Sequence, residues 1–548
     1  MIKNIFFNIY KKVLFYLYEI YLKETQHKTI FPRNILKNVF KIYEGYSVNS
    51  NFKYRIAAPL TEVSIINIVN YKRHYEFYDC LKLEGETVVS ILKTNADYLL
   101  PLIITDSRNT KSFPQHEISL NFNHTSQKTQ LCTVNRTHYL PLRSVQTDIK
   151  ITSATTNCIV GKPLLFNINK KIKRKIILHL FIDALSQEVV SGNLHKYLPF
   201  THEFFNDGYS FNNCFAQSEW TLSSMSSIFT GKYVNEHLVY HPDKFTPIKD
   251  ITIAQQMQSN NYTTLGISSV PRLTPLNHFD KGFDRFIMAK FAPIHSVLDY
   301  AIDNIQTFNV DKLYLFIALF DMHEAHNIQS ILSQSLNNLE HFQFVKFSRR
   351  KPSDTYPVND ECRVARYIKH LIYLDSKLKY LYEIINSISD EITAVFHSDH
   401  GISFNTNTSH ILGKEREKVP LCFKSKHTTK KIFNNIFEVK NVFNFLSDDI
   451  KNIKPIVPEV KFSITESIYP QRPYHIAVRS EKKVLFGCIP WEYLTKRQSN
   501  RDYFKFSYHY TEDESVEICK DDEYFEMILC AENHYNNLIN NPKLMILN

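Results

Sequence analysis

Three stretches of this chain are almost continuously apolar, and each ends in an aspartate. They are Ile176–Asp183, Leu313–Asp321 and Ile392–Asp399. Continuous apolar runs are typical of strands covered on both faces, as in a parallel sheet flanked by helices. Apolar residues at helical spacing between them, as in Ile251–Asn260 and Val364–Ser387, predict those covering helices. The alternation of strand and helix therefore predicts an α/β domain with a mostly parallel central sheet over residues 169–465.

The segments on the N-terminal side of this domain have a different pattern. Residues 1–45 predict a helical segment, in which Ile5–Tyr21 is apolar but interrupted by two lysines and a glutamate. Such a stretch favours an amphipathic helix that docks on the protein or touches a membrane surface, and not a transmembrane span. Residues 46–168 carry short alternating runs separated by Asn, Asp, Ser and Pro, which predict a β-rich accessory domain.

Composition and charge limit the kinds of partner, and the location, that we expect for this chain. Its 548 residues are 43% hydrophobic and 22% charged, as in globular proteins, and the formal net charge of +10 is modest for this length. The basic run Lys170–Lys175 is typical of a solvated linker, and without an array of basic and aromatic residues we expect no specific nucleic-acid partner. Nine scattered cysteines without a CxxC pair, and no recognisable signal peptide, favour a cytoplasmic location with or without peripheral membrane contact.

The hydroxyl-rich stretch 217–231 contains the strongest candidate nucleophile. Apolar residues at helical spacing begin just after Thr221, so this residue is expected at the start of a helix. A hydroxyl there has two interpretations. It caps the helix, or it is a nucleophile at the positive helix end, where backbone N–H groups can hold an anionic phosphate. The stretch by itself favours the cap.

The residues at the predicted strand ends favour the second interpretation, in which Thr221 is a nucleophile. In open α/β sheets, ligands bind outside the carboxyl ends of the strands, so Asp183, Asp321 and Asp399 are expected along one rim. Histidines follow two of these aspartates: His323 and His326 come after Asp321, and His400 and His410 come after Asp399. A single acid after a strand is usually a turn residue or a helix cap. Three of them, two followed by histidines, indicate a metal site.

Carboxylates and imidazoles together are ligands for a divalent metal ion. Zinc is favoured where imidazole takes part, with manganese, magnesium or calcium as alternatives. We expect Asp183, Asp399 and His400 to hold one ion. Thr221 would complete its coordination, because a metal lowers the pKa of a bound hydroxyl and so activates it. Four residues are left to build a second metal site or to bind the ester oxygens of the substrate: Asp321, His323, His326 and His410.

The order of these motifs resembles the alkaline phosphatase superfamily, in particular its sulfatase-like branch. The matching segments are Phe181–Asp183, Thr221–Tyr233, Phe320–His323, Ser398–Gly401, His410, Gly413–Lys414, Glu417–Leu421 and Tyr469–Arg479. The resemblance covers about residues 175–520 and implies a sulfatase-like α/β core. It also implies a small C-terminal α+β subdomain over 466–548, and a place for Lys414 beside His410 in the second metal or substrate site.

Some residues of this chain differ from the pattern of the sulfatase-like branch, and these differences limit the reaction that the resemblance implies. Its true sulfatases carry Cys or Ser at the nucleophile and an Arg further along the motif, and convert the first residue to formylglycine. This chain has Thr221–Met225 there, with neither Cys nor Arg. Threonine cannot form that aldehyde, and a plain threonine is similar to the nucleophile of the family's phosphodiesterases and phosphoethanolamine transferases. Ala184 replaces the second acid that the family often has after the first strand, which implies fewer oxygen ligands.

These features predict a metal-dependent phosphoryl-ester hydrolase or phospho-group transferase, with one or two ions and a covalent phospho-enzyme at Thr221. The expected substrate is an anionic phosphoester, on a small molecule, a glycan or a lipid head group. Two alternatives stay open. One is a sulfuric-ester hydrolase that works without formylglycine, and the other is a binding protein that kept the fold but not turnover.

Overall fold

The structure is a computed structural model, and it describes most of the chain. The described residues are 41–44, 54–59, 74–82, 86–91, 95–104, 116–122, 125–131, 137–153, 158–166, 174–242, 246–323, 361–403, 410–498 and 501–544. The predicted amphipathic helix over Ile5–Tyr21 lies outside them. The predicted helical segment does not extend to Lys41–Glu44, because these residues form strand β1, hydrogen-bonded antiparallel to β2 (Tyr54–Pro59).

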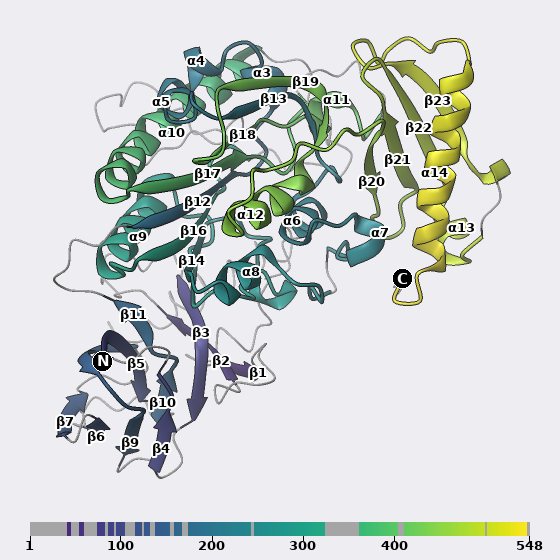
Figure 1. Ribbon diagram of the computed structural model, residues 1–548. Coiled ribbons are helices and arrows are strands. Elements are labelled where there is room, and N and C mark those ends of the chain that lie inside the picture. The colour runs from purple at the N-terminus through teal and green to yellow at the C-terminus, as the bar shows by residue number, and fades with distance from the viewer. Residues whose placement is uncertain are drawn as a thin grey trace, which may run out of the picture.

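Five parallel neighbours form the middle of a large sheet (Figure 1). In spatial order they are β15 (Arg285–Met288), β14 (Thr263–Ser268), β16 (Lys312–Leu319), β12 (Lys175–Ile182) and β17 (Glu391–His397). β16, β12 and β17 are buried along most of their length, which is why their sequences are continuously apolar. The predicted α/β fold is confirmed.

Antiparallel strands extend this sheet beyond β17, so the sheet as a whole is mixed. β18 (Leu421–Lys424) pairs antiparallel with β17 and with β13 (Tyr209–Phe215), and β13 pairs parallel with β19 (Lys431–Glu438). Helices cover both faces. One face packs against α5 (Pro199–Phe204), α9 (Ile294–Thr307) and α10 (Glu361–Ile388). The other packs against α6 (Thr221–Thr230), α8 (Ile253–Ser259) and α12 (Val442–Ile450).

The N-terminal β region continues the same sheet at its other edge. β3 (Tyr75–Lys82) pairs antiparallel with β15, and β10 (Cys158–Gly161), β5 (Ala96–Ile104) and β11 (Leu164–Phe166) follow it, with β8 (His138–Val145) also paired to β5. A second sheet has the order β4 (Glu86–Val89), β9 (Ile149–Ser153), β6 (His116–Phe122) and β7 (Thr125–Leu131). A buried ion pair between Arg55 and Asp280 joins this region to the α/β core. The domain boundaries at 45, 168 and 465 stay predictions.

The C-terminal residues form a separate four-stranded antiparallel sheet. Its strands are β20 (Ser463–Ser467), β21 (Tyr474–Arg479), β22 (Lys483–Ile489) and β23 (Lys505–Tyr510). α13 (Trp491–Thr495) and α14 (Asp522–Asn540) contribute to an apolar core on one face (Figure 1). Arg479 joins this sheet to the α/β core through a buried ion pair with Glu417, and a second buried ion pair with Glu514 lies within the C-terminal part. None of the described helices combines the length and apolarity needed to cross a membrane.

Candidate active site

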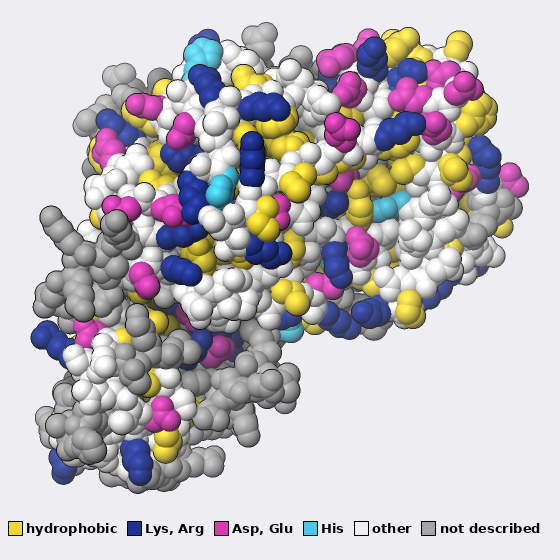
Figure 2. Space-filling model, in the orientation of Figure 1, with side chains coloured by type: hydrophobic (Ala, Val, Ile, Leu, Met, Phe, Trp, Pro, Cys, Tyr) yellow, Lys and Arg dark blue, Asp and Glu magenta, His cyan; other side chains and the backbone are white. Residues whose placement is uncertain are grey.

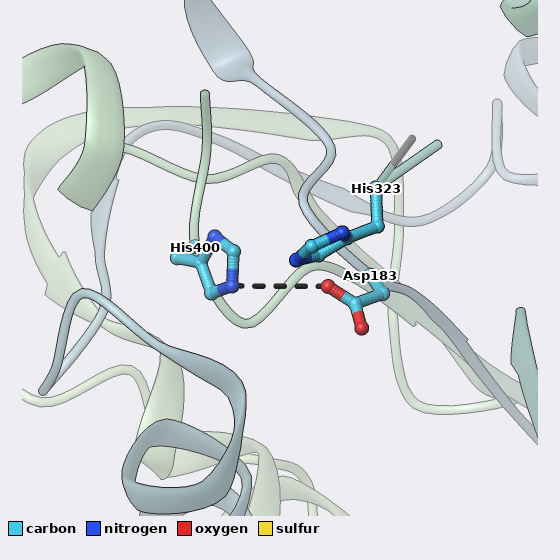
Figure 3. A group of neighbouring side chains, drawn as sticks. All are labelled: Asp183, His323 and His400. Atoms are coloured by element: carbon cyan, nitrogen blue, oxygen red, sulfur yellow. Dashed lines mark ion pairs between the residues drawn. The ribbon is translucent and has the colours of Figure 1, made fainter. Parts of the chain in front are cut away.

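Three predicted ligands from three neighbouring strands meet at one edge of the sheet. Asp183 follows β12, His323 lies beyond the end of β16, and His400 lies beyond the end of β17. Because these strands are parallel and adjacent, the segments that follow them leave the sheet at the same edge. Each of the three side chains offers one ligand atom, and these atoms all lie within 4.8 Å of one another (Figure 3). We call these three residues the ligand group.

Asp399 is oriented toward the ligand group by backbone donors. One carboxylate oxygen, Oδ1, accepts hydrogen bonds from the N–H groups of Ala184 at 3.1 Å and His400 at 2.9 Å. The other, Oδ2, is buried, accepts no hydrogen bond from the described residues, and lies 3.4 Å from His400 Nε2. A buried carboxylate oxygen is costly to leave uncompensated. This oxygen therefore fits a cation placed beside His400.

A backbone carbonyl fixes the tautomer of His400. Its Nδ1 lies 3.0 Å from the carbonyl oxygen of Gly401, which only accepts, so Nδ1 carries the proton and Nε2 presents a lone pair. Nε2 lies 3.7 Å from Asp183 Oδ1 and 3.4 Å from Thr221 Oγ1. Burial lowers the pKa of His400 against the opposing effect of Asp399. The imidazole is thus neutral at pH 7 and suited to bind a metal through Nε2.

The candidate nucleophile stands where the sequence predicts it, at the first residue of α6. The preceding Trp220 is extended, and no side chain caps the start of the helix. Ser224 Oγ donates to the carbonyl oxygen of Asp399 at 2.7 Å, which fastens the first turn of α6 to the end of β17. The distance of 3.4 Å between Thr221 Oγ1 and His400 Nε2 follows from that attachment. Thr221, Asp399 and the ligand group form one compact site.

Two polar residues that sequence reasoning missed hold the loop after β12. Ala184 has a left-handed backbone (φ 59°), a conformation unusual for a residue with a Cβ. The Tyr367 hydroxyl on α10 donates to the carbonyl oxygen of Ala184 at 2.9 Å, and Ser398 Oγ accepts from Leu185 N–H at 2.8 Å. Ser398 adjoins Asp399 and so was detectable by position. Tyr367 lies in a helix whose apolar pattern gives no sign of this role.

Two predicted members of the second site are not part of the ligand group. Asp321 Oδ1 accepts a hydrogen bond from the Ile294 N–H at 2.9 Å and so binds the start of α9. Burial raises the pKa of Asp321 to about 6. The ring of His410 stacks on Phe486 of β22 with centroids 3.9 Å apart. Of the predicted second set, His323 is the residue that the structure brings to the ligand group.

The remaining two residues predicted for the second site are Lys414 and His326. Lys414 Nζ donates to the backbone carbonyl oxygen of Glu512 at 2.6 Å, so its amine is directed to the C-terminal subdomain. His326 lies outside the described residues. The ligand group is the one cluster of three or more such side chains in the described part of the chain.

The donor set determines which kind of ion fits. The site offers two carboxylates, two imidazoles and one hydroxyl, a mixed oxygen and nitrogen set that suits a divalent metal. Asp183 and Asp399 are both fully buried beside a neutral imidazole, so a cation here would offset the cost of burying their charge. The structure thus supports a divalent metal site without identifying the metal.

Comparison with known families agrees with this geometry. A model of the family named "Sulfatase" matches residues 175–449, half of the chain. The chain belongs to the sulfatase family. The matched range includes the whole ligand group, Thr221 and Asp399, so the family core and the candidate active site coincide. The sulfatase family lies within the alkaline phosphatase superfamily, and the resemblance of the motifs to that superfamily is confirmed.

Solved structures similar to this chain include sulfatases and a phosphonate hydrolase. A protein solved with its substrate D-glucosamine-2-N,6-O-disulfate is 13% identical, with a TM-score of 0.48 and coverage of 68% of this chain and 99% of its own. A 2-O GAG sulfatase is 13% identical (TM-score 0.47; 68% and 92% covered). A phosphonate monoester hydrolase from Silicibacter pomeroyi is 11% identical (TM-score 0.47; 66% and 94% covered). A search of curated proteins found no match.

Proposed function

We propose that this sulfatase-family protein is a metal-dependent phosphoryl-ester hydrolase or phospho-group transferase that uses Thr221 as its nucleophile. The observation that carries the proposal is the meeting of Thr221 Oγ1 with His400 Nε2 and the two buried aspartates at the uncapped start of a helix. Asp183, Asp399 and His400 would hold the ion, with His323 beside them. The bound ion would lower the pKa of the threonine hydroxyl and polarise the ester.

The chain's own groups supply the rest of the reaction. The Thr221 oxygen attacks phosphorus, the bond to the leaving-group oxygen breaks, and the phosphoryl group stays on Thr221 until water or an acceptor hydroxyl takes it. The first N–H groups of α6 have no partner within the helix and no side-chain cap, so they are available to the negatively charged phosphoryl oxygens. His400, held neutral by burial, would keep its Nε2 lone pair available to the ion.

The residue at the nucleophile favours phosphorus over sulfur. Formylglycine forms from Cys or Ser, and this chain has threonine at that position. Membership of the sulfatase family nevertheless keeps sulfate esters as a second candidate. Aryl phosphate monoesters, aryl phosphate diesters and aryl sulfates should be assayed side by side. We expect turnover of the phosphorus substrates, and a preference for the aryl sulfate would replace the proposal with the second candidate.

Thr221→Ala tests the mechanism. We expect a loss of activity of about a thousandfold or more, with the metal content and thermal stability unchanged. Thr230→Ala is a matched control, because this buried threonine ends the same helix and its hydroxyl donates only to Ser226 O, at 2.7 Å. After an acid quench during turnover, mass spectrometry should find a phosphoryl group on Thr221. A Thr221→Ala variant with retained metal and retained activity would end this proposal.

A further inference from the structure

One face of the C-terminal sheet carries a line of polar side chains. Strand pairing places His475 on β21, Cys488 on β22 and Lys505 on β23 opposite one another, and Ser467 on β20 begins the same line. Residues paired in this way point to the same side of a sheet. The other side belongs to the apolar core that α14 completes, so the line lies on the face away from α14.

A pocket of about 240 Å³ lies over this line, and we call it the C-terminal pocket. A volume of about 15 Å³ is enough for one water, so the pocket has room for a group of several heavy atoms. The His410 ring stacks on Phe486 with centroids 3.9 Å apart and forms one wall. The sheet contributes His475, Phe486, Cys488, Lys505 and Ser507 to the lining, and residues 410–412 line the pocket from the other side.

The first residue of the line contacts the segment that carries the candidate nucleophile. Ser467 Oγ donates a hydrogen bond to Glu219 Oε1 at 2.5 Å. Glu219 precedes Thr221 by two residues, a span of at most about 7 Å. His475 lies one strand spacing, about 4.8 Å, beyond Ser467. The pocket therefore begins beside the segment that leads into Thr221.

The opposite wall of the pocket is attached to the active site as well. Gly401, the residue after His400, donates its N–H to the Arg416 carbonyl oxygen at 2.6 Å. Arg416 and the wall residue Leu412 belong to one short segment, in which the Arg416 N–H donates to the Gly413 carbonyl oxygen at 2.9 Å. Both walls of the pocket thus continue into segments that hold Thr221 or His400.

The pocket offers hydrogen-bond donors, and no carboxylate is among its described lining residues. Lys505 is exposed and makes no ion pair in the described part of the chain. The side chains of His410 and His475 likewise have no hydrogen-bond partner among the described residues. Burial lowers the pKa of both imidazoles, so each is neutral at pH 7 and has one N–H to donate.

A third imidazole stands beside the wall that His410 forms. The ring centroids of His410 and His509 are 5.1 Å apart. Both ring nitrogens of His509 are buried and make no hydrogen bond with the described residues. Such groups are uncommon in folded proteins, and an ion bound nearby is one of their known explanations. The polar groups in and around the pocket thus share a lack of acceptors from the described chain.

We propose that the C-terminal pocket binds an anionic group on the organic part of the substrate, with Lys505 supplying the positive charge. The group is a phosphate or a carboxylate, whose oxygens can accept from an ammonium, an imidazole N–H and a hydroxyl together. A neutral sugar would also need acceptors for its hydroxyl hydrogens, and the described lining provides no carboxylate for them. This inference rests on the proposed function and names its substrate class, a phosphoester whose organic part carries a second anion.

The thiol of Cys488 can report occupation of the pocket without any turnover. Cys488 is half-buried in the lining, and the exposed Cys519 serves as an internal reference. The protein is treated with iodoacetamide in potassium phosphate, potassium acetate or potassium chloride of equal ionic strength, and peptide mass spectrometry follows each cysteine. We expect phosphate or acetate to slow the alkylation of Cys488 severalfold relative to chloride and to leave Cys519 unchanged. The more protective of the two salts identifies the preferred anion.

Lys505→Gln decides whether that protection comes from the proposed contact. The ratio of the alkylation rates with and without the anion should fall to one, because the charge that holds the anion is gone. Using this ratio removes any direct effect of Lys505 on the reactivity of the thiol. No protection of Cys488 in the wild-type protein, or the same protection in Lys505→Gln, would overturn the inference.

Matched substrates test whether the pocket serves the reaction. 4-Nitrophenyl phosphodiesters carry an alkyl arm of about 10–20 Å, the span from Thr221 along the line, and the arm ends in a phosphate, a carboxylate or a hydroxyl. We expect the wild-type protein to prefer an anionic end. Lys505→Gln should lower kcat/KM for that substrate about three- to tenfold, as for one partly exposed charged contact, and leave the hydroxyl-ended substrate unchanged. Lys505→Arg should keep the preference, and so should Lys482→Gln, at an exposed lysine between β21 and β22.

The two experiments separate this inference from the proposed function. Equal kcat/KM for the charged and uncharged arms in the wild-type protein, or an equal fall for both in Lys505→Gln, would overturn the pocket as a substrate site while the proposed function stands. If the wild-type protein cleaves none of the phosphodiesters, the proposed function fails, and the alkylation of Cys488 then decides by itself whether the pocket binds an anion.

Discussion

A buried row of hydrogen-bonded side chains, made of His397, His179 and Tyr314, gives the sharpest prediction about the stability of the protein. His397, the last residue of β17, presents Nδ1 to the Ser398 carbonyl oxygen at 3.1 Å, so that nitrogen carries a proton and Nε2 accepts. His179 Nε2, 2.8 Å from His397 Nε2, must then donate. That leaves His179 Nδ1 as an acceptor, and the Tyr314 hydroxyl donates to it at 2.8 Å. The Ser398 carbonyl group thus determines which ring nitrogen carries the proton in both histidines, and that the Tyr314 hydroxyl donates.

Tyr314→Phe removes the donor and leaves the buried acceptor on His179. All three side chains are fully buried, so water cannot replace the lost hydroxyl. An unsatisfied buried group costs about 1–3 kcal/mol, and Tyr314→Phe should lower the free energy of unfolding by that amount. The assay is urea unfolding monitored by circular dichroism. The lower free energy of unfolding should appear as a lower midpoint urea concentration, while the slope of the free energy against urea concentration stays the same. Tyr380→Phe, at an exposed tyrosine on α10, is the matched control and should have no effect.

A double-mutant cycle decides whether the hydrogen bond is responsible. In a His179→Leu background no acceptor remains, so adding Tyr314→Phe should cost much less than it does alone. The same cost in both backgrounds would refute the assigned proton order, because the effect would then come from packing. Wild-type stability in Tyr314→Phe would refute the reasoning altogether.

Two further predictions concern the metal site and the response to acid. A Cβ at Gly401 would collide with the Glu415 carbonyl oxygen, so Gly401→Ala should displace His400 and weaken metal affinity about 10–100-fold, measured by competition with a chelator. His237 is buried between Ser227 Oγ and the Val239 N–H, and burial lowers its pKa to about 3. Below pH 6.5 the unfolded chain takes up a proton that the folded chain refuses, so this residue should make the protein about 2 kcal/mol less stable at pH 5 than at pH 7. Urea midpoints at the two pH values should differ less in His237→Gln, and an unchanged difference would contradict the assignment.

Local pattern was sufficient for the main elements and for part of the site. The continuous apolar runs identified β12, β16 and β17 because strands buried on both faces admit few polar residues. Their parallel arrangement brought Asp183, Asp399 and His400 to one edge, as the sequence predicted. The apolar spacing after Thr221 correctly placed the start of α6. These features depend on residues close together in the chain.

The choice among the remaining candidates was made by tertiary packing. Asp321 and His323 are two residues apart, yet only His323 belongs to the ligand group, while one oxygen of the Asp321 carboxylate accepts a hydrogen bond from the start of α9. His410 and Lys414 follow the same loop but meet Phe486 and the backbone of Glu512. Side-chain direction depends on which distant element packs nearby, and spacing along the chain does not contain that information.

Strand order was likewise decided only in three dimensions. The sequence predicts which runs are strands, but not that β14 and β15 lie next to β16 on the side away from β12. Nor does it predict that β3 continues the sheet past β15. The sequence by itself predicted the main elements and the places of the candidate nucleophile and of most of the candidate metal ligands, since burial and helix starts leave local patterns. Neighbouring strands are selected by complementary packing between segments far apart in the chain, so their order, and the surface it creates, belongs to the folded protein alone.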